Sequence, residues 1–184
     1  MIDKQAFRTQ KRAEIRILPE AYIAASDAGI FQQLAALPEF QTAGRIFAYY
    51  SVGREADTQR ILAQASALGK SIALPVVLGS GRMEYALFER PEQLCPGTLR
   101  IPEPSPDMPR VTPVPGDLLL VPGLCFDGEK YRMGQGGGYY DRYLPGCTAV
   151  TVGLARERLM PVRVPREVYD RPVDILITEA RILR

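Results

Sequence analysis

Asp117-Leu-Leu-Leu-Val121 (DLLLV) is a short, continuous apolar run, and its pattern decides the fold. A strand buried on both faces has this uninterrupted pattern, which is typical of a central position in a parallel sheet. Two further runs, Thr148–Leu154 (TAVTVGL) and Val173–Thr178 (VDILIT), have the same character. Because helical patterns precede these strands, the chain is predicted to form a layered, Rossmann-like α/β sheet.

The segments around this core alternate between helix and strand. Apolar periodicity and capping residues predict helices over residues 3–16, from Pro19 to Leu37 with Pro38 as the stop, and from Asp57 or Thr58 to about Gly69. β-rich patterns predict strands at 45–50 and 71–74, a hairpin of 76–78 with 83–88, and a short terminal strand at 181–183. A further short helix is expected to begin near Tyr139.

A proline-rich excursion separates the two halves of the chain. Eight of the 16 prolines fall between residues 90 and 115. This density excludes helix and central strand, so we expect a long extended connection over the surface. The flanking halves are short for separate domains, and we therefore expect one domain spanning residues 1–184.

The composition excludes several classes of protein. The 184 residues contain no histidine, which rules out a Ser-His-Asp triad and any His-ligated zinc or haem site built from this chain alone. The three cysteines form no CxxC pair, so a disulfide framework is not expected. No apolar run approaches the roughly 20 residues of a membrane span. The charged N-terminus lacks a signal-peptide core, and we expect a cytoplasmic location.

Four glycines lie within five residues, at Gly134, Gly136, Gly137 and Gly138, directly before the expected helix at Tyr139. Glycines at this density let the backbone approach a ligand and turn its N–H groups toward an anion. The loop has neither Walker nor dinucleotide-binding spacing. Taken alone, these glycines are also compatible with a flexible turn.

The neighbours of the glycine loop favour nucleotide chemistry. Arg132 can contact phosphate oxygens, Tyr139 and Tyr140 offer flat faces to an aromatic ligand, and Asp141 can hold Mg²⁺ beside phosphates. Near the N-terminus, Lys4 and Arg8 are spaced i, i+4, so both project from one helix face. Two such cations either grip an anion or form an ordinary solvated face. The basic surface with interleaved aromatics that nucleic-acid binding requires is missing.

The segment PGLCFDGEKYRMGQGGGYYDRYL, residues 122–144, resembles the signature of the 5-formyltetrahydrofolate cyclo-ligase family, also called 5,10-methenyltetrahydrofolate synthetases. Lys4 and Arg8 match the family's N-terminal Lys-x-x-x-Arg. Residues 50–55 (YSVGRE) match its substrate-binding segment, and Asp174 matches the late Asp of its C-terminal strand. The resemblance covers nearly the whole chain.

The resemblance implies a layered α/β fold similar to that of ribose-5-phosphate isomerases and CoA-transferases. It also implies ATP- and Mg²⁺-dependent ring closure. In that reaction the formyl oxygen of 5-formyltetrahydrofolate is phosphorylated, N10 attacks the activated carbon, and 5,10-methenyltetrahydrofolate, ADP and phosphate result. The implied partners are small molecules, with no nucleic acid or membrane, and a monomer or weak homo-oligomer is expected.

The resemblance also assigns roles to individual residues. The implied catalytic residues are Arg132, Tyr139 and Glu55. The implied ATP-binding residues are Lys4, Arg8, Arg132, Gly134, Gln135, Gly136, Gly137, Gly138, Tyr139 and Tyr140. The implied folate-binding residues are Tyr50, Glu55, Gln135, Gly136, Gly137, Gly138 and Tyr139. The implied Mg²⁺ ligands are Asp141 and Asp174. Some members carry a lysine in the loop where this chain has Gly137.

Other interpretations stay open at this point. The same sheet would suit a phosphosugar or CoA-type binding or transfer module, or a non-catalytic folate-binding paralogue. Tyr50 is also compatible with packing and Glu55 with a solvated carboxylate, and Asp174 with a turn cap or a pair with Arg171. Cys125 has no partner base, so we interpret it as a small buried hydrophobe.

Overall fold

The central strands of the sheet are the apolar runs described above. In the computed structural model, which describes residues 3–98 and 101–184, these runs form β7 (Leu118–Val121), β10 (Val150–Leu154) and β11 (Ile175–Ile177). β7 pairs in parallel with both β10 and β1 (Arg45–Phe47), and all four of its residues are buried. The eight-stranded sheet has the order β12-β11-β10-β7-β1-β2-β3-β6. The layered α/β class predicted from the sequence is confirmed.

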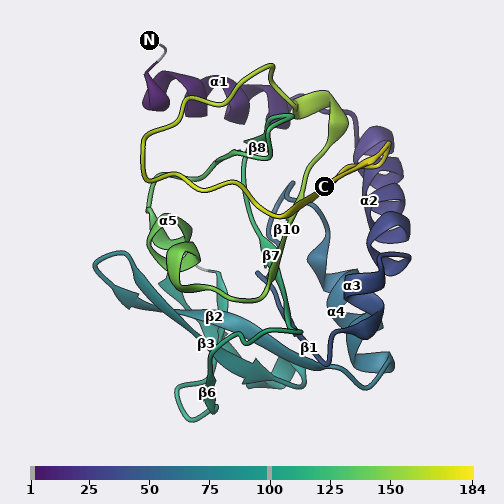
Figure 1. Cartoon of the computed structure of the whole chain (residues 1–184), viewed down its shortest axis with the longest axis vertical. Helices are drawn as coiled ribbons and strands as arrows, with labels where there is room; N and C mark the ends of the chain where they lie inside the picture. The colour runs from purple at the N-terminus through teal and green to yellow at the C-terminus, as the bar shows by residue number, and fades with distance from the viewer. Residues whose placement is uncertain (1–2, 99–100) are drawn as a thin grey trace.

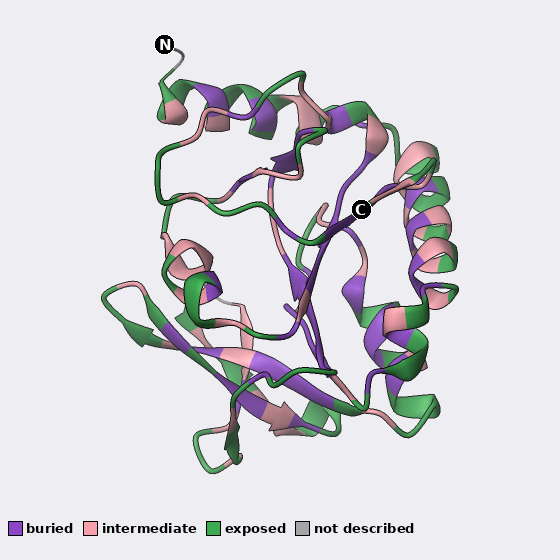
Figure 2. Cartoon of the chain, in the orientation of Figure 1, coloured by how far each residue is buried: buried purple, intermediate pink, exposed green. Residues whose placement is uncertain are grey.

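The two faces of the sheet are covered differently. Leu118 and Leu120 belong to the apolar cluster under the helices α2 (Glu20–Ala35), α3 (Pro38–Thr42) and α4 (Thr58–Ala67). Leu119 and Val121 point to the opposite face, toward the segment that contains α5 (Tyr139–Tyr143). In Figure 1, α2, α3 and α4 line one side, whereas α1 (Lys4–Arg16) crosses one end of the molecule. Figure 2 shows the central strands buried between these layers.

The predicted helices are present, with small differences in their boundaries. Asp3 caps α1 and Asp57 caps α4, and Gly69 follows α4 with a φ of +71°. The second helix ends at Ala35 rather than Leu37. Pro38 does not merely stop it, because it is the first residue of the separate helix α3, a position where its fixed φ is favourable.

The hairpin contains a longer strand than predicted. Instead of two strands at 71–74 and 76–78, β2 runs through Pro75 from Ser71 to Gly79 and pairs antiparallel with β3 (Arg82–Phe88). The preceding strand β1 ends at Phe47, whose partner in β2 is Ala73, so it is also shorter than the predicted 45–50. Pro75 lies beyond the residues of β2 that pair with β1, so its missing N–H removes no hydrogen bond to β1.

The proline-rich excursion contains more pairing than predicted. After the short 3₁₀ turn η1 (Pro91–Gln93), β4 (Leu94–Pro96) pairs with β5 (Pro102–Pro104), while residues 99–100 lie outside the described ranges. β6 (Arg110–Val111) pairs with β3 and forms one edge of the main sheet. Proline is tolerated at such an edge because one side of the strand needs no donors.

The remaining short elements lie at the ends of the sheet. β12 (Ile182–Leu183) is the predicted terminal strand and pairs antiparallel with β11. A ribbon of β8 (Cys125–Phe126) and β9 (Arg132–Met133) leads from β7 toward α5, and the 3₁₀ turns η3 (Leu144–Gly146) and η4 (Glu157–Leu159) flank β10. Across residues 3–98 and 101–184, every helix is too short or too polar to span a bilayer.

Candidate active site

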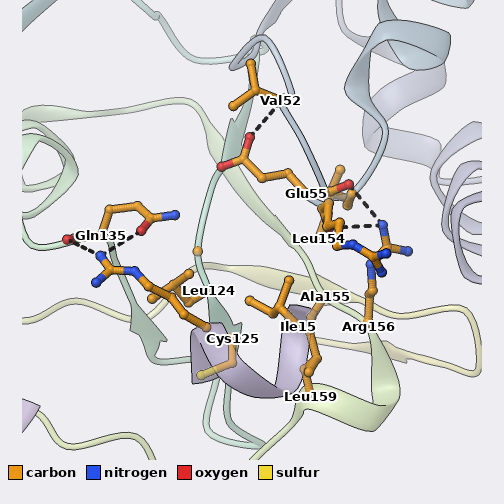
Figure 3. Close-up of a pocket in the computed structure, with 14 residues that line it drawn as sticks. Ile15, Val52, Glu55, Leu124, Cys125, Gln135, Leu154, Ala155, Arg156 and Leu159 are labelled. Atoms are coloured by element: carbon orange, nitrogen blue, oxygen red, sulfur yellow. Dashed lines mark hydrogen bonds between the residues drawn. The ribbon is translucent and has the colours of Figure 1, made fainter. Parts of the chain in front are cut away.

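The candidate site lies at the carboxyl ends of the central parallel strands. The connection from β1 leads to β2, its neighbour in one direction along the sheet, whereas the connection from β7 leads to β10, its neighbour in the other direction. The connections therefore diverge between the adjacent strands β1 and β7. Ligands of open α/β sheets bind beyond such a point. A cavity of about 250 Å³ lies here, and Figure 3 shows its lining. The lining residues are Arg12, Ile15, Val52, Arg54, Glu55, Ala56, Gly123, Leu124, Cys125, Gln135, Leu154, Ala155, Arg156 and Leu159.

The glycine loop between β9 and α5 is held by two arginines of α1. Arg8 donates from Nε to the carbonyl oxygen of Gly134 at 3.1 Å, and Arg12 donates to the carbonyl oxygen of Gln135 at 3.1 Å. Gly136 has a φ of +107° and lies beside the Arg8 guanidinium, a conformation that an L side chain rarely adopts. The structure therefore brings Arg8 and the predicted cradle together.

Arg132 carries a buried charge next to the loop. Its side chain is 4% exposed, and its guanidinium pairs with Asp141 Oδ1 at 2.5 Å. It also lies 5.9 Å from the centre of the Tyr140 ring. Asp141 is in the first turn of α5 and one third exposed, so the carboxylate that pairs with the buried cation is itself open to solvent.

The two tyrosines after the loop have different surroundings. The Tyr140 hydroxyl is hydrogen-bonded to the Tyr85 hydroxyl at 3.2 Å, and burial raises its pKa far above the ordinary value. Tyr139 instead leans on the loop, because a Cβ at Gly137 would lie 2.6 Å from its ring. Gly137 is thus the residue that permits the Tyr139 ring to pack there.

The loop after β1 supplies Tyr50 and Glu55 from the opposite side. Tyr50 donates to Gln59 at 3.2 Å and lines a second, adjoining cavity of about 440 Å³. Glu55 lines both cavities, and its Oε2 accepts from the Val52 amide at 3.0 Å. Desolvation by burial raises the Glu55 pKa, and the hydrogen bond from Val52 offsets part of that shift.

Two predicted residues have partners away from the glycine loop. The Lys4 ammonium pairs with Asp170 at 2.8 Å and lies 3.7 Å from Glu167, both in the C-terminal segment. Asp174 precedes β11, and its Oδ2 accepts from the Thr151 amide at 2.8 Å and from the Thr151 hydroxyl at 2.7 Å. The structure therefore assembles Arg8, Arg132, Asp141 and the glycines, and it places Lys4 and Asp174 outside that group.

Comparison with known proteins gives the family. Residues 1–179 match the model of the 5-formyltetrahydrofolate cyclo-ligase family. A relative from Haemophilus influenzae, named 5-formyltetrahydrofolate cyclo-ligase, is 31% identical over 182 residues, covering 92% of this chain and 97% of its own. The Escherichia coli K12 protein of the same name is 29% identical over 151 residues, or 79% and 83% of the two chains. The chain belongs to this family.

A solved structure of a cyclo-ligase relative has the same fold. The Aquifex aeolicus 5,10-methenyltetrahydrofolate synthetase superposes with a TM-score of 0.85 at 30% identity, covering 98% of this chain and 92% of the other. The resemblance of residues 122–144 to the signature of this family is therefore confirmed, and the chain belongs to a family of enzymes. The roles assigned to single residues stay predictions.

The carboxylates of this chain suit one kind of metal site. The described residues hold no group of three or more His, Cys, Asp or Glu side chains that would enclose an ion. Mg²⁺ commonly binds through one or two carboxylates together with substrate phosphates and water. Asp141, partly exposed beside the loop, fits that pattern. Asp174 is already engaged by Thr151, and its role as a ligand stays a prediction.

Two residues of the cleft were not predicted from the sequence, Arg156 and Asp27. Arg156 lines the cavity, and its buried guanidinium pairs with Asp27 of α2 at 2.9 Å. The signal for Arg156 was its place directly after the apolar run of β10, because side chains there reach the carboxyl edge of the sheet. Asp27 has no comparable signal, since it lies within an ordinary helical pattern.

Cys125 also lines the cavity, but as a buried thiol. Burial raises its pKa to about 12, so it is protonated at neutral pH and is a poor nucleophile. Cys95, Cys125 and Cys147 are free in the structure.

Proposed function

We propose that this chain converts 5-formyltetrahydrofolate to 5,10-methenyltetrahydrofolate with ATP and Mg²⁺. The observation that carries the proposal is the cleft between β1 and β7, which is lined by Gln135 of the glycine loop on one side and by Glu55 on the other. The buried cation of Arg132 lies directly before that loop and pairs with Asp141. ATP, the phosphate donor, and the reduced folate, a polar heterocycle, have to face each other from opposite walls of one cleft. The family match supports both substrates.

The phosphates of ATP are assigned to the glycine-loop wall. The loop amides of residues 134–138, with Gln135, Tyr139 and Tyr140 beside them, would surround the phosphates, and Arg8 and Arg132 would neutralise their charge. Lys4 is paired with Asp170, so its part in binding requires that a phosphate oxygen replaces this carboxylate. Mg²⁺ would be held by Asp141, with Asp174 as the second predicted ligand, and it would neutralise phosphate charge.

The folate is assigned to the wall formed by residues 50–55. Tyr50 would line its pocket, and Glu55 would contact the reduced pterin or its N10 side. A carboxyl group with a raised pKa is suited to take up the proton that N10 loses when it forms its new bond. Tyr139 would lie where nucleotide and folate meet.

The chemistry then consists of two displacements. The formyl oxygen attacks the γ-phosphorus, and the bond to ADP breaks. N10 next attacks the formyl carbon, its proton leaves, and the carbon–oxygen bond breaks to release phosphate. An amide-like oxygen is a poor leaving group until it is phosphorylated, so the protein must mainly position the substrates and neutralise charge.

The experiment that tests this function is a near-ultraviolet absorbance assay of methenyl formation. Purified protein is mixed with 5-formyltetrahydrofolate, ATP and Mg²⁺, and each component is omitted in turn. We expect an absorbance rise only in the complete mixture. If the complete mixture gives no rise while folate still binds, a non-catalytic folate-binding paralogue is the better reading; if neither folate nor nucleotide binds, a phosphosugar or CoA-type module is. The cytoplasmic location and the monomeric or weakly homo-oligomeric state remain predictions.

A further inference from the structure

The loop that carries Glu55 is closed at its base by a reciprocal pair of hydrogen bonds. The Ser51 amide donates to the Thr58 hydroxyl at 2.9 Å, and the Thr58 amide donates to the Ser51 hydroxyl at 3.1 Å. Both residues are buried. This bracket fixes where the loop leaves β1 and enters α4, but it leaves the tip, where Val52 and Gly53 are exposed, to be held by other groups.

Arg156, which follows β10 two strands away in the sheet, holds the part of the loop that carries Glu55. Its guanidinium donates to the carbonyl oxygen of Glu55 at 2.9 Å and to that of Arg54 at 3.3 Å. The side chain is 3% exposed and extends from the end of β10 toward the loop, as Figure 3 shows. Arg156 therefore fixes the backbone from which the Glu55 carboxylate projects.

Asp27 completes the clamp from α2. Its Oδ1 forms an ion pair with Nη1 of Arg156 at 2.9 Å and accepts a hydrogen bond from the Asp57 amide at 3.2 Å. Arg156 also donates to the carbonyl oxygen of Ile23 at 3.3 Å. The two terminal nitrogens of Arg156 thus each bind two protein oxygens, so the guanidinium is already committed to the protein rather than presented to a ligand.

We propose that Arg156 is a positioning residue for Glu55, and that the Asp27–Arg156 pair sets the place of this carboxylate in the cleft. The proposal rests on the function proposed above for Glu55. Only a planar guanidinium matches the geometry, because its separate nitrogens reach the loop carbonyls and Asp27 at once. A lysine carries the same charge on a single nitrogen and cannot bridge both sides in the same way.

The surroundings of Glu55 make its pKa sensitive to the position of its carboxylate. The charged and titratable side chains that line the two cavities together with Glu55 are Arg12, Arg54, Arg156, Asp27, Asp57, Tyr50 and Cys125. Glu55 also helps to raise the pKa of the Tyr49 and Tyr140 hydroxyls. Burial dominates the raised pKa of Glu55. A loosened loop would hydrate the carboxylate, and its pKa would fall toward the ordinary value.

The test is a double-mutant cycle with Arg156→Lys, Glu55→Gln and the combination of both. We expect Arg156→Lys to lower kcat/KM for the reduced folate about 10- to 100-fold, as misplacement of a reacting group does, with little change in KM for ATP. On the Glu55→Gln background the same substitution should cost less than about threefold, because its target is already lost. Arg181→Lys is the matched control, since Arg181 forms an exposed pair with Glu157 outside the cleft.

Equal losses on both backgrounds would overturn the proposal, because Arg156 would then act independently of Glu55. Asp27→Asn keeps the shape of the clamp and should give a smaller loss of the same kind. A readout without catalysis separates this proposal from the proposed function. Carbon NMR of labelled glutamate in the free protein should show a lower Glu55 pKa in Arg156→Lys than in the parent protein. An unchanged pKa with a folded protein contradicts the positioning role even if no ring closure is ever detected.

Discussion

Among the single residues, Arg132 is expected to contribute most to the reaction, because its buried cation lies beside both the glycine loop and Asp141. We expect Arg132→Ala to lower kcat by one to several orders of magnitude, since a phosphoryl-stabilising cation is lost. The absorbance assay measures this loss, and thermal unfolding checks that the variant folds. Arg184→Ala, which removes an exposed pair with Glu39, should leave kcat unchanged. Near-normal turnover of Arg132→Ala would show that other groups neutralise the phosphate charge.

Gly137 tests the loop geometry at the same scale. A methyl group at this position would lie 2.6 Å from the Tyr139 ring, so the ring or the loop must move. We expect Gly137→Ala to weaken ATP binding about tenfold, a loss of about 1.4 kcal/mol, measured by calorimetry in the presence of Mg²⁺. Gly146→Ala is the control, because no atom lies within 4 Å of the position its Cβ would take. Equal affinities of the two variants would argue against a role for this packing.

Glu55 is predicted to reduce stability at neutral pH. Its pKa is raised above 4.5, so the folded chain holds the proton more tightly than the unfolded chain. The unfolding free energy should therefore fall as the pH rises from about 4.5 through the folded pKa. Glu55→Gln removes this penalty and should be more stable than the parent at pH 7, with little difference below pH 4.5. Urea unfolding at both pH values measures the effect, with exposed Glu92→Gln as control. A less stable Glu55→Gln at pH 7 would contradict the desolvation argument.

At the scale of elements, β7 carries the core. Leu120 is fully buried under the helical layer, so Leu120→Ala should lower the free energy of unfolding by about 2–5 kcal/mol through lost burial and an added cavity. Urea unfolding measures the loss. Val168 is 97% exposed, and Val168→Ala should change the stability by less than about 0.5 kcal/mol. A loss below about 1 kcal/mol for Leu120→Ala would mean that β7 is not the tightly packed centre of the sheet.

The elements also show why part of the fold could be predicted. The β7 run and the Asp57 cap depend on neighbouring residues, so pattern alone identifies them. Asp3, predicted as the first helical residue, is instead the cap of α1. The path of β2 through Pro75 depends instead on where its neighbour β1 stops, which no local pattern reports. Helix α3 has five residues, too few for a helical period, and β6 forms because β3 offers it an edge.

At the scale of the whole molecule, the cleft combines near and distant parts of the sequence. Arg132, the glycines and Asp141 lie within ten residues, so their meeting could be predicted from their spacing. Arg156 and Glu55 are 101 residues apart and meet only because β1 and β10 flank β7. For the same reason the sequence could not show that Lys4 faces Asp170. That residues 1–184 act as one domain stays a prediction.

The central claim is that this cleft couples one ATP to one ring closure. The most direct measurement follows methenyl absorbance and inorganic phosphate in the same sample of purified protein, 5-formyltetrahydrofolate, ATP and Mg²⁺. The account predicts one phosphate for each methenyl product, with neither formed when folate or ATP is omitted. Methenyl formation without ATP, or phosphate release that continues without folate at the same rate, would contradict it.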